Sequence, residues 1–189
     1  MVDYQTISIM FTGLSVNLAA FYYIMTLRNT QKNQELIRKA QEQALETRRT
    51  QLLMHVFQEM SSEASMRRFA DVMNMEWEDY GDFESKYGSD DHPEQFAKRL
   101  SVWRTFQGIG LLLKDGLVDA DGLYDLIGSA VIFQWVKWEP MFKEFRVRYG
   151  LPDDYELFEN LYHELMKVRR QRGITEDPSE TGLKYIPTE

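Results

Sequence analysis

The sequence predicts an all-α protein: a single N-terminal transmembrane helix continues into a helical stalk and then a compact bundle of four or five further helices. Three observations support this fold class. An uncharged run extends from Thr6 to Leu27. Helix breakers are scarce after it, since no proline precedes Pro93 and no glycine lies between Gly13 and Gly81. Further along, apolar residues recur at steps of three and four, which is typical of helices that bury one face.

The uncharged run predicts the first element, a membrane anchor over residues 1–28. At a rise of about 1.5 Å per residue, a helix of this length matches the roughly 30 Å hydrocarbon layer of a bilayer. A cleaved signal peptide would open with basic residues and end in small ones. Here the only preceding charge is Asp3, and the run ends in the bulky sequence FYYIM. A buried core helix is the other alternative, but core helices rarely extend so far without a charge. We therefore expect the lipid bilayer to be the partner of Thr6 to Leu27.

Basic residues after the run predict the orientation. Arg28, Lys32, Arg38 and Lys39 follow it, whereas no lysine or arginine precedes it. Because positively charged flanks stay on the cytoplasmic side, we expect a single-pass protein of the cell membrane with its N-terminus outside and its bundle in the cytoplasm. The absence of cysteine agrees with a reducing compartment without requiring one.

Composition limits the classes of partner. The chain has 189 residues, of which 43% are hydrophobic and 13% aromatic, so one packed domain of about 120 residues can follow the anchor and its connector. The net charge is −8, which argues against nucleic acid as a partner, because phosphate binding depends on clustered cations.

Residues 29–51 predict a polar helical stalk. They are rich in Gln, Glu, Lys, Arg and Ala, which favour helix. Coiled-coil spacing is present with small or polar residues at most seam positions: Ile37, Ala40, Ala44, Thr47, Gln51 and Met54. A solvated stalk and a dimerising zipper both fit this pattern.

Residues 52–173 predict the helical bundle, because cap-type residues and glycines divide them. Expected starts are Ser61 with Ser62, Asp91 with Pro93 and Glu94, Asp119, and Pro152 with Asp153 and Asp154. Expected ends are Gly116, Gly150 and Gly173. Pro140 is expected to kink or restart its helix, since proline removes a backbone donor. Residues 174–189 form an acidic tail that we expect to be flexible or laid against a partner.

The expected core is aromatic and aliphatic. The predicted buried stripes are Phe96, Leu100, Trp103, Phe106, Gly110 and Leu113; Leu123, Leu126, Ile127, Ala130, Val131, Gln134, Trp135 and Trp138; and Tyr155, Phe158, Leu161, Tyr162, Leu165 and Val168. All four tryptophans, Trp77 included, are expected in the core rather than in a ligand cage.

Two groups of residues are candidate interaction sites. In the predicted span, the polar Asn17 and its small neighbours could contact another membrane helix: Gly13, Ser15, Asn17 and Ala19. The acidic segment could dock a basic partner or an ion through Glu76, Glu78, Asp79, Asp82 and Glu84. The alternative for the acidic segment is a solvated face whose aromatic residues turn inward.

Catalytic, metal and cofactor motifs are not found. His163 is followed by Glu164, but Lys167 stands where a zinc-protease helix needs its second histidine. His55 and His92 are far from it in sequence. An enzyme would require a polar pocket around groups such as His163, Glu159 or the acidic segment.

Four stretches carry a resemblance to a known family: LETRRTQLLMHVFQEMSS, NMEWEDYGDFESKYG, RLSVWRTFQGIGLLLKDGLVD and LYDLIGSAVIFQWVKWEPMFKEFRVRYG. Together with the preceding membrane segment, they resemble a prokaryotic family known as a domain of unknown function (4760 type), over roughly residues 45–170. The resemblance implies a membrane-tethered helical domain and brings no catalytic residue.

The function expected from the sequence is a membrane-tethered cytoplasmic interaction module, or an accessory subunit of a membrane protein complex, that partners a membrane protein or itself. Two alternatives stay open. One is a homo-oligomeric sensor or channel-like assembly, and the other is an enzyme with an unrecognised polar pocket.

Overall fold

The computed structural model describes residues 3–176 and 178, except for the side chains of residues 6, 7, 9 and 11. Its elements are α1 (Tyr4–Met60), α2 (Glu63–Met73), α3 (Tyr80–Tyr87), α4 (Pro93–Lys114), α5 (Ala120–Tyr149) and α6 (Glu156–Gln171). No strand occurs among the described residues, so the all-α prediction is confirmed. The chain divides into two compact units, Met1–Thr47 and Arg48–Glu189.

The first unit consists of the N-terminal part of α1, which continues without interruption into the polar stretch, as expected. Its described side chains are exposed throughout. The polar part carries ion pairs one helical turn apart, with Lys39 Nζ 2.8 Å from Glu35 Oε1 and Arg38 Nε 3.7 Å from Glu42 Oε1. Ile37, the largest residue of the proposed zipper seam, is 57% exposed. A solvated stalk and a dimerising zipper both stay predictions.

The predicted membrane span is not confirmed. Within the part of the chain that the structure describes, no helix is both long enough and apolar enough to cross a membrane. The uncharged run contains polar residues, which lower its mean hydropathy: Ser8, Thr12, Ser15 and Asn17. Four other members of that run, Thr6, Ile7, Ile9 and Phe11, lie outside the residues whose side chains are described.

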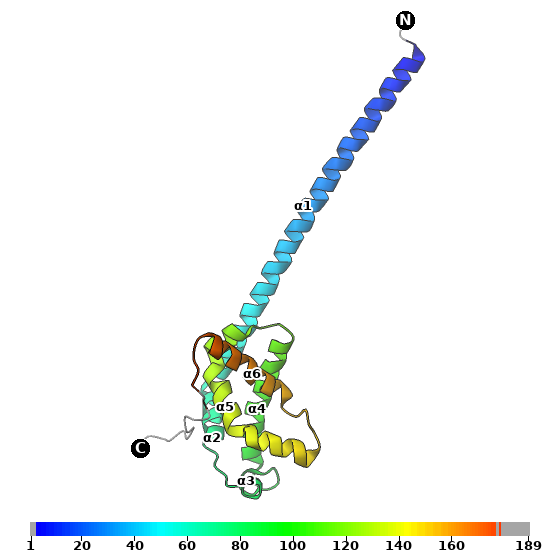
Figure 1. Cartoon of the computed structure of the whole chain (residues 1–189). Coiled ribbons are helices and arrows are strands. Elements are labelled where there is room, and N and C mark those ends of the chain that lie inside the picture. The colour runs from blue at the N-terminus through cyan, green and yellow to red at the C-terminus, as the bar shows by residue number, and fades with distance from the viewer. Residues whose placement is uncertain (1–2, 177, 179–189) are drawn as a thin grey trace. The chain divides into compact units, whose positions relative to one another are not determined.

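The second unit is a bundle in which α2 and α6 both pack on α4, and α6 also packs on α5 (Figure 1). Several predicted caps are confirmed. Ser62 Oγ accepts a hydrogen bond of 3.2 Å from the Ser65 N–H at the start of α2. Asp119 Oδ1 accepts one of 2.7 Å from the Gly122 N–H at the start of α5. Gly150 ends α5 in the left-handed conformation, with φ 65°, where a side chain would be strained.

Pro93 lies in the first turn of α4, as predicted, but the residue that caps the helix is His92, not Asp91, and it makes no side-chain cap bond. At Pro140 the expected restart is wrong, because α5 runs through the proline. Trp138, Met141 and Phe142 are buried on both sides of it, and this packing outweighs the lost backbone bond. The alternative, a kink, stays a prediction.

The predicted start of α6 is wrong, because the helix begins at Glu156 rather than at residues 152–154. The Asp154 N–H donates to the Leu151 carbonyl oxygen at 3.1 Å, so these residues form a turn before the helix. Tyr155 then adopts a left-handed conformation, with φ 58°, immediately before α6 begins. The predicted tail lies largely outside the described residues, because residues 177 and 179–189 are not among them.

The core is aromatic, as the sequence predicts. Trp103, Trp135 and Trp138 are at most 2% exposed. The rings of Trp103 and Trp138 meet edge to face with centroids 4.9 Å apart, and Trp77 stacks on Trp138 at 4.4 Å. The predicted stripe of α6 is confirmed by Phe158, Leu161 and Leu165, which are fully buried. In α5 one stripe residue, Leu126, is instead 37% exposed and lines a pocket.

Candidate functional site

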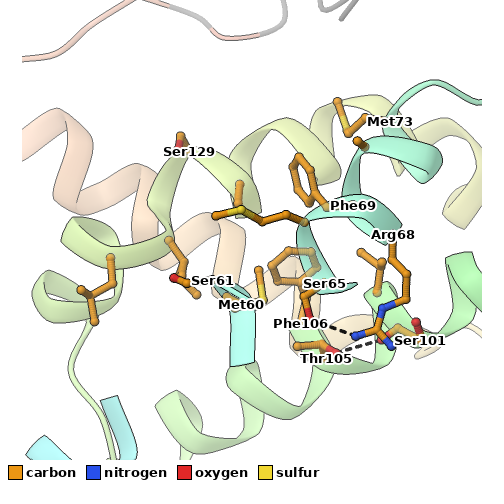
Figure 2. A pocket seen from close by; sticks show the side chains of 16 residues that line it. Met60, Ser61, Ser65, Arg68, Phe69, Met73, Ser101, Thr105, Phe106 and Ser129 are labelled. Carbon is orange, nitrogen blue, oxygen red and sulfur yellow. Dashed lines mark hydrogen bonds between the residues drawn. The ribbon is translucent and has the colours of Figure 1, made fainter. Parts of the chain in front are cut away.

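A pocket of about 330 Å³ opens between the end of α1 and helices α2, α4 and α5 (Figure 2). It is lined by Met60, Ser61, Ser65, Met66, Arg68, Phe69, Ala70, Met73, Ser101, Val102, Thr105, Phe106, Leu126, Ile127, Ser129 and Ala130. Its volume lies within the range of small-molecule sites, which is roughly 300–1,000 Å³. All of these residues belong to the second unit.

The floor of the pocket is apolar and buried, whereas its rim includes an exposed methionine. Met73, Val102, Phe106 and Ile127 are each at most 8% exposed and belong to the packed core. At the rim, Met66 is 57% exposed. Methionine side chains are flexible and polarizable, so a rim of this kind can fit ligands of different shape.

Arg68 is the one charged side chain among the described residues that line the pocket. Its Nη2 donates a hydrogen bond of 2.9 Å to Ser65 Oγ, as Figure 2 shows. Its Nη2 also lies 3.8 Å from Glu59 Oε1, an ion pair that is too long to be a hydrogen bond. A guanidinium carries five N–H donors, so most of its capacity is left for another anion.

Hydroxyl groups on α4 line the wall near Arg68. Ser101 Oγ donates to the Lys98 carbonyl oxygen at 2.9 Å, and Thr105 Oγ1 donates to the Ser101 carbonyl oxygen at 2.9 Å. Because their protons are used within the helix, these oxygens can act only as acceptors toward the pocket. The pocket thus combines an apolar floor with a polar side built around Arg68.

Sequence reasoning missed this pocket because it assigned Phe106, Ile127 and Ala130 to the core stripes. The space arises where small residues face bulky ones, with Ala70 on α2 and Ala130 on α5. A signal was present in the three methionines Met60, Met66 and Met73, spaced over two helices, but methionine in a helical stripe usually indicates ordinary core.

Two carboxylates of the predicted acidic docking surface already accept hydrogen bonds from residues of the same segment. Asp79 Oδ1 caps α3 by accepting a hydrogen bond of 2.9 Å from the Asp82 N–H. Asp82 Oδ2 accepts from the Lys86 Nζ at 2.7 Å and from the Glu78 N–H at 2.9 Å. The bond from Lys86, and then that from Glu78, lowers the pKa of Asp82. These carboxylates therefore stabilise the turn into α3.

The other two acidic candidates lie near tyrosine hydroxyls. Glu84 Oε1 accepts from the Tyr80 hydroxyl at 3.2 Å, and the Glu76 N–H donates to the Tyr87 hydroxyl at 3.1 Å. Burial, followed by the hydrogen bond to Tyr149, raises the pKa of Tyr80. No cluster of acidic and histidine side chains that could hold a metal ion occurs within residues 3–176 and 178. Docking of a basic partner stays a prediction.

The four candidate residues for a membrane-helix contact do not share one face of α1. Asn17 lies one turn after Gly13 and donates from Nδ2 to the Gly13 carbonyl oxygen at 2.8 Å. Both residues line a shallow depression with Ser8, Thr12 and Val16. Ser15 and Ala19 form a separate pair, because residues two apart in a helix point in different directions. A contact with another membrane helix stays a prediction, and it could involve the face of Gly13 and Asn17 or that of Ser15 and Ala19.

The groups considered for catalysis are not assembled into a site. His163 has a 57% exposed side chain, and its Nε2 lies 3.9 Å from Glu159 Oε1. Glu159 Oε2 instead accepts a 2.7 Å bond from Arg146 Nη2. His55 lies near the end of α1, and His92 precedes α4.

Comparison with known proteins gave one match. A family model described as a domain of unknown function, DUF4760, covers residues 9–165. Neither a curated protein nor a solved structure matches the chain.

Proposed function

We propose that this chain, which belongs to the DUF4760 family, is a membrane-tethered interaction module serving as an accessory subunit of a membrane protein complex. The N-terminal part of α1 would be the tether, and the bundle would be the part that meets its partner in the cytoplasm. The exposed apolar side chains of the first unit support the tether, and the pocket in the second unit supports a binding role.

The observation that carries the proposal is the exposed apolar surface of α1. Large side chains in the uncharged run leave most of their area uncovered: Leu14 is 60%, Leu18 is 62% and Phe21 is 64% exposed. Val16, which points away from Leu14 and Leu18, is 63% exposed. Large apolar side chains on opposite sides of one helix are stabilised by apolar surroundings, and a bilayer supplies them.

Polar side chains in this run are satisfied within the helix. Thr12 Oγ1 donates to the Ser8 carbonyl oxygen at 2.9 Å, and Thr26 Oγ1 donates to the Tyr22 carbonyl oxygen at 2.9 Å. The amide of Asn17 bonds in the same way to Gly13. Such bonds reduce the cost of placing polar groups in lipid, where unsatisfied donors are expensive.

The proposed partner is a membrane protein or a second copy of the chain. Gly13 has open space where a Cβ would lie, and it shares the depression on α1 with Asn17. Small residues let two helices approach closely in lipid, and an amide can bond across them. This depression also favours the second candidate, a homo-oligomeric sensor or channel-like assembly.

Membrane fractionation tests the tether. The full chain should remain in the membrane pellet after an alkaline carbonate wash. The double variant Val16→Lys and Leu18→Lys should move to the supernatant, because each central lysine costs about 2.5–3.5 kcal/mol in lipid. The matched control is Leu151→Lys, at a bundle position that is also exposed, by 52%. It should leave the chain in the pellet. Wild-type chain in the supernatant would refute the tether.

Copurification in a gentle detergent tests the accessory role. We expect the chain to come with a membrane protein or as a defined oligomer, and Gly13→Leu should weaken that association by filling the depression. Ala19→Leu, on another side of the helix, is the control. Recovery of a lone monomer from native membranes would contradict the interaction role.

A further inference from the structure

The pocket between α1, α2, α4 and α5 has two chemically different parts. One part is a hydrocarbon-like surface made by Met60, Phe69 and Met73 together with the floor residues. The other part is the guanidinium of Arg68 with the hydroxyl of Ser65 beside it. A ligand that matches both parts must carry an apolar body and an anionic head.

Arg67 and its neighbour Arg68 differ in their ion pairs with carboxylates. Arg67 makes two bonds to Glu63 Oε1, from Nε at 3.0 Å and from Nη2 at 2.6 Å, on the exposed side of α2. The nearest acidic oxygen to Arg68 in the described structure is that of Glu59, at 3.8 Å. The planar guanidinium of Arg68 can therefore take a carboxylate as a forked pair of hydrogen bonds.

The volume of the pocket and the residues that line it indicate which class of ligand it can bind. Four helices bound a volume of about 330 Å³, near the lower limit for small-molecule sites. A partner helix would need a groove long enough to take anchors from several of its turns, and a pocket of this volume does not provide one. A two-chain phospholipid would also need more room than one such pocket. A single flexible chain fits both the volume and the methionine lining.

We propose that this pocket binds a free long-chain carboxylate, with its head on Arg68 and Ser65 and its alkyl chain against Met60, Phe69 and Met73. Ser65 Oγ accepts from Arg68, so its own proton can point to the carboxylate. The proposal stands apart from the membrane tether, because all of its residues belong to the second unit.

Photo-crosslinking tests the proposal in the full chain, held in lipid nanodiscs. The probe is a twelve-carbon fatty acid with a diazirine at the end of its chain. After illumination, peptide mapping by mass spectrometry should place the label on residues of α2 or on the facing residues of α5. Mapping by position separates pocket binding from simple partition into lipid, which would label the N-terminal part of α1.

Three comparisons sharpen the result. Arg68→Met should reduce the pocket label about tenfold, as expected for loss of a charged hydrogen-bond pair, whereas Arg67→Met should leave it unchanged. The alkyl amine of the same length should label the pocket weakly, because Arg68 repels it. Ala130→Leu, which fills the pocket, should also abolish the label while helix content by circular dichroism stays the same.

Several outcomes would overturn the proposal. One is equal labelling of the wild type and Arg68→Met, and another is equal labelling by the acid and the amine. Label found only within residues 6–27 would show partition into lipid and no pocket site. If Ala130→Leu fails to fold, the pair Arg68→Met and Arg67→Met still decides the question.

Discussion

Two glutamines in the bundle show that the same type of side chain can stabilise or destabilise the folded state. Gln107 Oε1 accepts a hydrogen bond of 2.7 Å from the Phe158 N–H in the first turn of α6. Gln134 is fully buried on α5, and neither its Nε2 nor its Oε1 has a partner in the described structure. A buried polar group without a partner costs about 1–3 kcal/mol.

Replacement of these glutamines by methionine should therefore have opposite effects. Gln134→Met should raise the free energy of unfolding by about 1 kcal/mol, because an apolar side chain of similar size removes the unpaired amide. Gln107→Met should lower it by about 1–3 kcal/mol, since the Phe158 N–H loses its acceptor. Urea denaturation of both variants measures the difference. A large loss of stability in Gln134→Met would mean that its amide is satisfied after all.

A second prediction at the residue scale concerns pH. The bonds from Lys86 and Glu78 lower the pKa of Asp82 below its ordinary value of 3.8, so its charged form stabilises the folded state. This stability is complete above the ordinary pKa and is lost as the pH falls through the lowered one.

Asp82→Asn should remove that contribution. Between about pH 5 and about pH 2, its stability should fall less steeply than that of the wild type, as followed by denaturation at each pH. Asp91→Asn, at an exposed acid that does not cap α4, is the control and should retain the wild-type slope. Identical slopes for Asp82→Asn and the wild type would contradict the assigned bonds.

At the scale of the helices, one glycine allows α4 and α6 to pack closely. A Cβ on Gly110 would overlap the carbonyl oxygen of Leu157, which belongs to α6 and cannot move aside easily. Gly108, two residues earlier on α4, has open space around the same position. The two glycines therefore separate the effect of helix packing from that of helix propensity.

Gly110→Ala should destabilise the bundle by about 1–3 kcal/mol, because the added methyl group forces α6 away from α4. Gly108→Ala should instead stabilise it by about 0.5–1 kcal/mol, the usual gain within a helix. Thermal unfolding of both variants tests this contrast. Equal effects at the two positions would show that α6 does not lie against Gly110.

Much of the helical pattern could be predicted from the sequence, because caps and stripes are local signals. Ser62, Asp119 and Gly150 mark real helix ends, and the stripe of α6 is buried as expected. Whether α5 would continue through Pro140 or restart there could not be decided from the sequence, since it depends on packing around the proline. The pocket around Arg68 was missed for a similar reason, because it forms only where residues from four helices meet.

At the scale of the whole molecule, the chain joins two units of different character. The first is a helix whose apolar and polar side chains alike are exposed, and the second is a bundle with an aromatic core. The basic residues that follow the uncharged run are the basis for the proposal that the bundle lies on the cytoplasmic side of a membrane.

Cysteine accessibility in whole cells tests the proposed topology most directly, since the chain has no cysteine of its own. Two single variants, Asp3→Cys and Asp91→Cys, would be exposed to a maleimide that cannot cross membranes. The account predicts labelling of Asp3→Cys in intact cells and of Asp91→Cys only after the cells are opened. Labelling of both sites in intact cells, or of neither until the cells are opened, would contradict a helix that crosses the membrane with its N-terminus outside.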